Sequence, residues 1–399
     1  MTRSFDNVKI KIQKAQVRFS ERNFDTMKRQ WTPEEAWEWY NKRQWICGFN
    51  YVPANCASRF DMWQEYRHEE KMPGIIAEIE KAHEYGFNAI RIIMSFECWK
   101  YQHDGYMERV EEFIDLCAKN EIGVMIVFGN DCTVPKEVYK APEFGPQHVD
   151  MGYHGGIAKS PHAGMGGVGY SVIDEPDLLE EFIEMIREIV TKYAKDPRVE
   201  VWDVFNELGN GRRCDKSVPA MERFFETIRA CDPIQPLTAC TWLIVRWARD
   251  PLNPKLQPLN PWERRALELS DVISYHDYRT LDTSVMVIDY LKKEFGRPLL
   301  NTEWLHRIQH NTVQTHLPLF FLEKVGCYHW GFVAGLNQTY EPWDSNWTNY
   351  YKGIETDVDF TKWQHDILRP NFRPYDPHEM EIFQKYIALA KAQFAESKK

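Results

Sequence analysis

The stretch from Arg198 to Asn210 reads RVEVWDVFNELGN and is the best guide to the fold of this chain. Apolar residues dominate it from Val199 to Phe205, which is typical of a strand buried on both faces. The sequence then turns polar with Asn206 and Glu207 and enters a glycine-containing loop. Catalytic side chains of parallel α/β folds lie at strand ends of this kind. Glu207 is therefore the first catalytic candidate.

A second strand of the same type supplies a second carboxylate. The segment from Pro298 to Trp304 reads PLLNTEW, and its apolar run ends in Glu303. The two glutamates are 96 residues apart. This interval leaves room for about three strand-helix units of ~30 residues each, as a barrel needs between its fourth and seventh strands.

The remaining sequence continues this alternation of apolar runs and amphipathic helical segments. Strands are predicted at residues 45–52, 88–94, 122–128, 199–205, 236–242, 271–275, 298–304 and 327–333. Eight strands separated by helices predict an α/β fold, a (β/α)8 TIM barrel with long loops over its C-terminal face. We expect residues 1–44 to form an extension packed on the barrel and residues 45–399 to form the catalytic barrel.

Two connections are far longer than the ~2 to 6 residues that a strand-to-helix loop needs. They are Gly129 to Glu175 and Ala334 to Pro374, and both follow strand ends on the predicted catalytic face. Long loops of this kind close the ends of a groove. This feature favours an enclosed pocket over an open cleft.

Composition excludes several classes of partner. The 399 residues carry a formal net charge of −10 without a basic cluster, so nucleic acid is not expected as a partner. No run of ~18 apolar residues predicts a membrane span, and the N-terminus lacks the apolar region of a secretion signal. A cytoplasmic protein is expected, although a sequence trimmed of its signal would look the same. No cofactor is expected, and the oligomeric state stays open.

The polar residues at the strand ends resemble the retaining glycosidases of the family 5-like clan A, the cellulase and mannanase superfamily. The matching positions are Asn206 and Glu207 in WDVFNE, Glu303 in NTEW, Arg91 on the second strand, His276 and Tyr278 after the sixth, and Trp330 on the eighth. Members of family 5 typically carry a histidine near the end of the third strand. This chain has Asn130 and Asp131 there, in FGNDC.

The resemblance implies a role for each matching residue. Glu207 is expected to protonate the leaving oxygen and Glu303 to attack the anomeric carbon. A hydrogen bond from Tyr278 and the charge of Arg91 would favour the ionised form of Glu303. The predicted substrate-binding residues are Arg91, Asn206, His276, Tyr278, Trp330, Asn130 and Trp99. Arg91 lies in an apolar run and requires an anion, which fits a structural ion pair as well as a direct role at the site.

This pattern favours a retaining β-glycosidase that hydrolyses β-linked oligosaccharides. Exo action on a β-mannoside, β-glucoside or β-galactoside is expected. An endo-acting β-1,4-glycanase, either a mannanase, a cellulase or a xylanase, is the alternative. A non-catalytic sugar-binding barrel would lack one carboxylate, and both are present here. A metal-dependent hydrolase needs ligands on several strand ends, which offer only His276 and Asp131, so no metal site is predicted.

Overall fold

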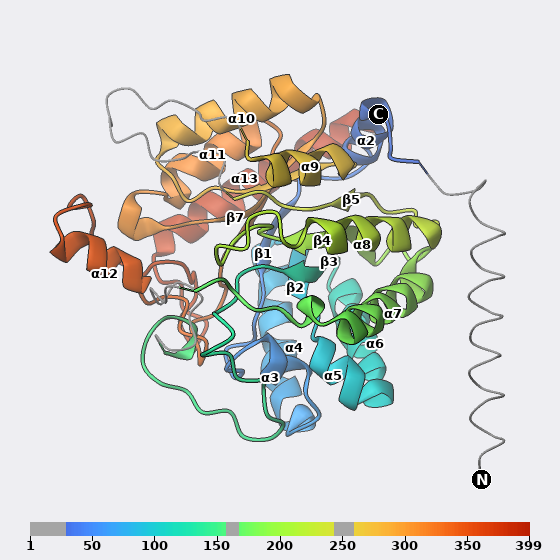
Figure 1. The fold of residues 1–399 in the computed structure, drawn as a ribbon. Helices are drawn as coiled ribbons and strands as arrows, with labels where there is room; N and C mark the ends of the chain where they lie inside the picture. Colours follow the sequence, from blue (N-terminus) through green and yellow to red (C-terminus); the bar gives the residue numbers. More distant parts are fainter. Residues whose placement is uncertain (1–28, 157–166, 243–258) are drawn as a thin grey trace, which may run out of the picture.

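The computed structural model describes residues 29–156, 167–242 and 259–399. Its centre is one sheet of eight parallel strands (Figure 1). The strands are β1 (Cys47–Asn50), β2 (Ala89–Ile93), β3 (Gly123–Asn130), β4 (Val199–Asn206), β5 (Leu237–Thr238), β6 (Ile273–His276), β7 (Leu299–Trp304) and β8 (Gly326–His329). Their order is β5-β4-β3-β2-β1-β8-β7-β6, and β1 pairs with both β2 and β8. The (β/α)8 barrel is confirmed.

The barrel closes between β5 and β6 through a single bridge. Thr241, just beyond β5, pairs in parallel with Tyr275 of β6. The N–H of Thr241 donates to the carbonyl of Ser274 at 3.3 Å, and the N–H of His276 donates to the carbonyl of Thr241 at 2.8 Å. Within the described residues, the other neighbouring strands are joined by ladders of two or more residue pairs. Strand pairing is therefore shortest at the β5–β6 seam of the described barrel wall.

Helices surround the strands (Figure 1). They are α2 (Pro33–Asn41), α3 (Arg59–Trp63), α4 (His68–Tyr85), α5 (Phe96–Tyr101), α6 (His103–Lys119), α7 (Pro176–Tyr193), α8 (Val218–Ala230), α9 (Pro261–Leu269), α10 (Leu281–Phe295), α11 (Val313–Leu322), α12 (Asp344–Tyr351) and α13 (Pro377–Ser397). In α7 the buried residues recur every three or four positions, so that one face packs on the barrel. None of the described helices has the length and apolar character needed to cross a bilayer.

Helix α2 covers the N-terminal end of the barrel. Thr32 caps it, because its hydroxyl accepts from the N–H of Glu35 while Glu35 accepts from the N–H of Thr32. Tyr40 of α2 packs in one buried cluster with strand residues such as Val201 and Leu300. The indole N–H of Trp37 donates to the carbonyl of Gly296 at 2.9 Å. The aromatic side chains of this segment thus fill core and lie at the end opposite to the C-termini of the strands.

Several predicted strands are shorter in the structure. The first was expected over residues 45–52, but β1 contains only Cys47–Asn50. The fifth was expected over residues 236–242, but β5 contains only Leu237–Thr238. The eighth was expected to reach residue 333, but β8 ends at His329, so Trp330 lies just beyond the strand. Backbone bonds nevertheless continue beyond β5 and β8, because the N–H groups of Thr241 and Trp330 donate to the carbonyls of Ser274 and Trp304. All nine cysteines lie in the described residues, and all are free.

Candidate active site

The two candidate carboxylates meet at the C-terminal mouth of the barrel. Glu207 follows β4 and Glu303 belongs to β7, and their side chains are buried, with 7% and 6% of each residue exposed. A carboxylate oxygen of each lies within 4.8 Å of the other. Inverting glycosidases hold the two groups ~6.5 to 9.5 Å apart to admit a water, whereas retaining enzymes hold them about 5 to 5.5 Å apart. The short distance between the two carboxylates matches the retaining geometry, in which one carboxylate attacks the sugar directly.

His276, at the end of β6, lies between the two carboxylates. Its Nδ1 is 2.7 Å from Oε1 of Glu207 and 3.3 Å from Oε2 of Glu303. Burial alone would lower the pKa of His276, but Cys240, Glu303 and Glu207 outweigh it and raise that pKa well above the usual value. The protonated imidazole therefore bridges two acidic groups that would otherwise repel each other.

Two groups donate to one oxygen of Glu207. The amide Nδ2 of Asn210 and the thiol Sγ of Cys132 each lie 2.5 Å from Oε2. The backbone of Glu207 has a φ of 48°, a left-handed conformation that a non-glycine residue rarely adopts. Its N–H donates to Sγ of Cys240 at 3.0 Å, which holds this turn at the end of β4. Glu207 is thus fixed through both its backbone and its side chain.

Glu303 has the two partners that the sequence predicts. Nη1 of Arg91 donates to Oε1 at 3.1 Å, and the hydroxyl of Tyr278 donates to Oε2 at 2.8 Å. Burial nevertheless raises the pKa of Glu303, and Glu207 adds to that rise, whereas His276, Arg91 and Tyr278 act in the opposite direction. The two contacts are present, but burial outweighs them.

Arg91 holds the floor of the site together. It is 1% exposed, and Nε and Nη2 donate to the same oxygen of Asp203 at 2.9 and 2.7 Å. Its remaining donors reach Asn50 at 2.8 Å, Asn206 at 2.6 Å and Glu303 at 3.1 Å. The two interpretations of Arg91 therefore both apply, since it forms a structural ion pair and also contacts a candidate catalytic group.

Asn206 and Asn130 extend this network across the mouth. Oδ1 of Asn206 accepts from Arg91, and its Nδ2 donates to Oδ1 of Asn130 at 2.9 Å. The same oxygen of Asn130 accepts from the N–H of Cys132 at 3.0 Å. Asn130 thus joins the end of β3 to both Asn206 and the thiol that contacts Glu207.

A large cavity opens above these residues, with a volume of about 1310 Å³. Both candidate carboxylates line it, together with Arg91, Asn130, Asn206, His276, Tyr278 and Trp330. The long loops contribute further walls through residues that include Tyr139, Tyr153, His154, Trp343 and Asn349. In Figure 1, α12 lies on the same side of the molecule as the loop that follows β3. Described residues of both long connections therefore line the cavity.

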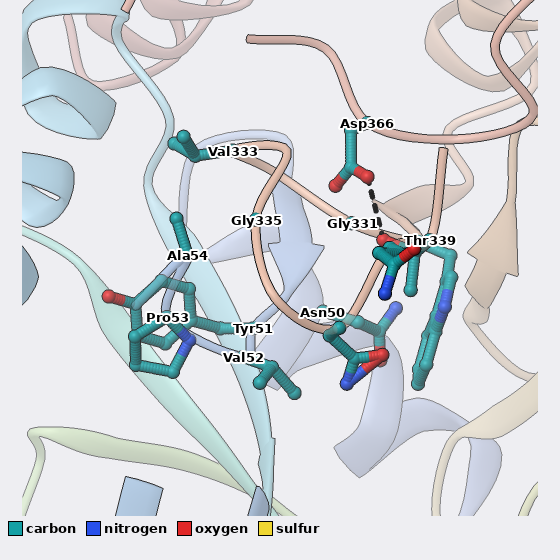
Figure 2. A pocket seen from close by; sticks show the side chains of 13 residues that line it. Asn50, Tyr51, Val52, Pro53, Ala54, Gly331, Val333, Gly335, Thr339 and Asp366 are labelled. Atoms are coloured by element: carbon teal, nitrogen blue, oxygen red, sulfur yellow. Dashed lines mark hydrogen bonds between the residues drawn. The ribbon is translucent and has the colours of Figure 1, made fainter. Parts of the chain in front are cut away.

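The loop that carries Trp330 is anchored behind the cavity. Figure 2 shows it against the segment that follows β1, around a small cavity of about 20 Å³. The hydroxyl of Thr339 donates to Oδ2 of buried Asp366 at 2.8 Å. Gly331 has a φ of +74°, and a Cβ there would lie 2.8 Å from Oγ1 of Thr339. Only glycine fits at this position, which fixes the path of the chain next to Trp330.

Trp99 does not join the other predicted binding residues. It belongs to α5, its indole N–H donates to Oε2 of Glu188 on α7 at 2.8 Å, and its ring stacks on Phe96. It is not among the residues that line the cavity. The position of Trp99 soon after the second strand suggested a site residue, but the intervening helical turn directs it to the outer helix layer.

The residues first considered as metal ligands separate in the structure. Asp131 is fully buried and accepts from Nε of Arg213 at 2.7 Å and from the N–H of Gly209 at 2.8 Å. Among the described residues, only Glu207, His276 and Glu303 form a group spaced closely enough to hold a metal ion. The guanidinium of Arg91 beside Glu303 and the protonated His276 disfavour a further cation there.

Four residues at the site were missed by sequence reasoning. Asp203 carried a signal, since it is a charged residue inside an apolar strand and is the anion that Arg91 requires. Cys132, Asn210 and Cys240 carried none, because a thiol or an amide in a loop is common and their contacts with Glu207 arise only in the folded barrel.

Comparison with solved structures reproduces this architecture at low sequence identity. The GH5_18 protein from Streptomyces cattleya in complex with GlcNAc has a TM-score of 0.54 at 12% identity, over 88% of this chain and 81% of that one. The endo-β-1,4-mannanase from Thermotoga petrophila has a TM-score of 0.51 at 15% identity, over 88% and 77%. These likenesses concern the fold.

The exo-β-1,4-mannosidase Op5Man5 from Opitutaceae bacterium strain TAV5 has a TM-score of 0.51 at 16% identity, and the match covers 90% of this chain but only 61% of that protein. No curated protein matches the sequence significantly. The family model for cellulase, glycosyl hydrolase family 5, matches residues 55–366, which span the barrel from the loop after β1 to the loop after β8. The chain therefore belongs to glycosyl hydrolase family 5 and is a glycoside hydrolase of the retaining type that characterises this family.

Proposed function

We propose that the protein is an exo-acting β-glycosidase in which Glu303 is the nucleophile and Glu207 the general acid and base. The observation that carries this proposal is the pair of carboxylates within 4.8 Å of each other, at the ends of β4 and β7 and inside a large cavity. In the first step Glu303 attacks the anomeric carbon while Glu207 gives its proton to the leaving oxygen. In the second step Glu207 takes a proton from water, which hydrolyses the glycosyl-enzyme.

The contacts of Glu303 support its assignment as the nucleophile. Arg91 and Tyr278 donate to its two oxygens, and a carboxylate that accepts such bonds is stabilised in its ionised form. Glu207 contacts an amide, a thiol and an imidazole. With Glu303 assigned as the nucleophile, Glu207 is the group that must exchange a proton in each step.

The walls of the cavity support binding of one sugar unit at the reacting centre. Asn206 keeps one Nδ2 hydrogen beyond its bond to Asn130, and that hydrogen can reach the 2-hydroxyl of the sugar. Trp330 lines the cavity and offers an aromatic surface on which a sugar ring can stack. Together with His276 and Tyr278, these residues form the proposed binding site for the non-reducing end.

The long loops are the support for exo action on short oligosaccharides. Residues from both connections line the cavity, including Tyr153 and His154 from one and Trp343 and Asn349 from the other. The ring of Tyr153 contacts that of Trp343 at 6.3 Å between centroids, so the two loops touch. Loops that meet over a barrel mouth limit the length of chain that can pass through it.

Hydrolysis of aryl β-glycosides tests the chemistry. We expect turnover of at least one of the p-nitrophenyl β-mannoside, β-glucoside and β-galactoside, with no loss in EDTA. β-Mannosides come first because a mannosidase and a mannanase occur among the structural neighbours. Proton NMR of the first product should show the β-anomer before mutarotation. An α-anomer as first product would overturn the double-displacement mechanism.

Product analysis tests exo action separately. With mannan, glucan or xylan hexaoses, an exo-acting enzyme releases monosaccharide from one end first. Early mixtures of di-, tri- and tetrasaccharides would instead identify an endo-acting β-1,4-glycanase. A reducing-end label on the hexaose shows from which end the monosaccharide comes.

A further inference from the structure

The ring of Tyr278 packs against aromatic side chains from the loops after β7 and β8. Tyr278 is half-buried, and its hydroxyl donates to Oε2 of Glu303 at 2.8 Å. Its ring meets that of Trp343 edge to face at 5.1 Å between centroids, and the rings of His365 and His306 lie 5.4 and 6.1 Å away. These distances are typical of favourable aromatic pairs. Because Tyr278 also lines the large cavity, this packing limits the movement of its ring away from Glu303.

Gln364 connects the three residues whose rings pack on Tyr278. Its side chain is fully buried, and its Oε1 accepts from the backbone N–H of Trp343 at 2.9 Å. The same oxygen lies 3.0 Å from Nε2 of His306, and the amide Nε2 of Gln364 lies 2.8 Å from Nε2 of His365. Gln364 is not among the described residues that line the cavity, so it does not reach a substrate bound there.

The backbone N–H of Trp343 fixes the hydrogen positions of this network. Since a backbone N–H can only donate, the atom of Gln364 that faces it is the acceptor Oε1, and the amide Nε2 therefore faces His365. Burial lowers the pKa of His306 to about 4 and the pKa of His365 well below its usual value, so both rings are neutral at neutral pH. His306 then donates from Nε2, whereas His365 accepts at Nε2 and carries its hydrogen on Nδ1, which faces the carbonyl of Leu305. Every contact in the network thus pairs a donor with an acceptor.

We propose that Gln364 is a positioning residue that keeps the hydroxyl of Tyr278 on Glu303. It acts through the three rings that pack on Tyr278, because it contacts each of the residues that carry them. The rings of Trp343 and His306 also stack with centroids 4.5 Å apart, so a shift of one displaces the other. This inference rests on the proposed function, in which Glu303 is the nucleophile, since the bond from Tyr278 favours the ionised form that attacks the sugar.

A double-mutant cycle tests whether Gln364 acts through Tyr278. The variants are Gln364→Met, Tyr278→Phe and the combination of the two. The measured quantity is kcat/KM, which reports the step in which the nucleophile attacks, across pH and for the p-nitrophenyl glycoside that the wild type hydrolyses fastest. Gln235→Met is the matched control, because Gln235 is also buried and bonds to the indole of Trp202 and to two backbone carbonyls, at the N-terminal end of β5.

We expect Tyr278→Phe to lower kcat/KM by roughly 10- to 100-fold, because a hydrogen bond to a charged group is lost. Gln364→Met should lower it by about tenfold alone, but by less than about twofold in the Tyr278→Phe background. Burial raises the pKa of Glu303 and the bond from Tyr278 lowers it, so both variants should move the acidic limb of the pH profile to higher pH. Gln235→Met should lower the melting temperature without moving that limb.

Three results would each overturn the positioning role. They are an unchanged kcat/KM in Gln364→Met, a loss that persists undiminished in the Tyr278→Phe background, and an acidic limb that stays in place. If Gln364→Met does not fold, His306→Phe replaces it in the cycle with the same expected pattern, since it keeps a ring against Trp343 but cannot donate to Gln364. Glu303→Ala tests the proposed function separately. If it retains turnover, the nucleophile is wrongly assigned, and if it abolishes turnover while the cycle shows no coupling, only the positioning role fails.

Discussion

The buried pair of Arg91 and Asp203 allows stability and catalysis to be separated. Arg91→Met removes a guanidinium that contacts four side chains and leaves fully buried Asp203 without a counter-ion. Removing one partner of a buried pair costs about 3 to 5 kcal/mol in other proteins. The free energy of unfolding should therefore fall by about this amount.

Removing both charges should restore most of the stability. The double variant Arg91→Met/Asp203→Leu carries no charge at either of these two positions. Its free energy of unfolding is therefore expected within about 1 to 2 kcal/mol of that of the wild type. Its activity should stay low, because Glu303 and Asn206 each still lack the hydrogen bond that Arg91 donated. A bond to a charged group contributes about 1.5 to 3 kcal/mol, so kcat/KM should fall by roughly 10- to 100-fold.

Urea unfolding followed by tryptophan fluorescence measures the free energy of unfolding. Hydrolysis of the preferred p-nitrophenyl glycoside measures kcat/KM. The single variant Asp203→Leu completes the thermodynamic cycle and gives the coupling energy of the pair. Two results would refute the reasoning. One is a loss of stability below about 1 kcal/mol in Arg91→Met, and the other is a return of full kcat/KM in the double variant.

Three further results are expected. Glu303→Ala should abolish turnover of every substrate, whereas azide should restore turnover of Glu207→Ala and give a β-glycosyl azide. An α-glycosyl azide as the product would contradict retention of configuration. Burial raises the pKa of Glu78 to about 7 from 4.5, so the protonated side chain stabilises the fold below pH ~4.5 and this contribution is lost as pH rises through ~7. Glu78→Gln should therefore reduce the fall in the free energy of unfolding between pH 5 and 7.5, measured by urea unfolding, by at most about 3 kcal/mol. Gly331→Ala should raise KM through displaced Trp330 and lower the melting temperature, and unchanged values of both would show that the turn tolerates a side chain.

The barrel and its carboxylates could be predicted because both depend on local pattern. Parallel strands bring their C-terminal ends to one edge, so a polar residue that follows an apolar run, such as Glu207 or Glu303, has its place set by the strand itself. The same logic located Arg91, His276 and Tyr278. Trp330 was also placed correctly at the cavity, although the strand before it is shorter than expected.

Contacts between loops could not be predicted in the same way. Asn210 and Cys132 are separated by 78 residues, and their approach depends on how two turns fold over β3 and β4. Trp99 shows the opposite error, because an aromatic residue near a strand end was taken for a site residue although its ring packs in the outer helices. Whether a side chain outside a strand reaches the site depends on the tertiary structure, so its role could not be predicted from the sequence.

The β5–β6 seam has a consequence for motion. The rest of the described barrel wall is held by ladders of residue pairs, but here the strand pairing is a single bridge, in which the amides of Thr241 and His276 donate. The N–H of Asp271 adds a bond to the carbonyl of Leu237, and the N–H of Ser274 adds one to Oγ1 of Thr238. Cys240 on one side of the seam accepts from the N–H of Glu207, and His276 on the other side contacts its carboxyl. A local opening at this seam would therefore loosen Glu207 from two directions at once. Amide hydrogen exchange should detect this local opening, because the amides of Thr241 and His276 should exchange faster than those of β2, β3 and β4. Ligand binding at Glu207 should slow exchange at these two amides.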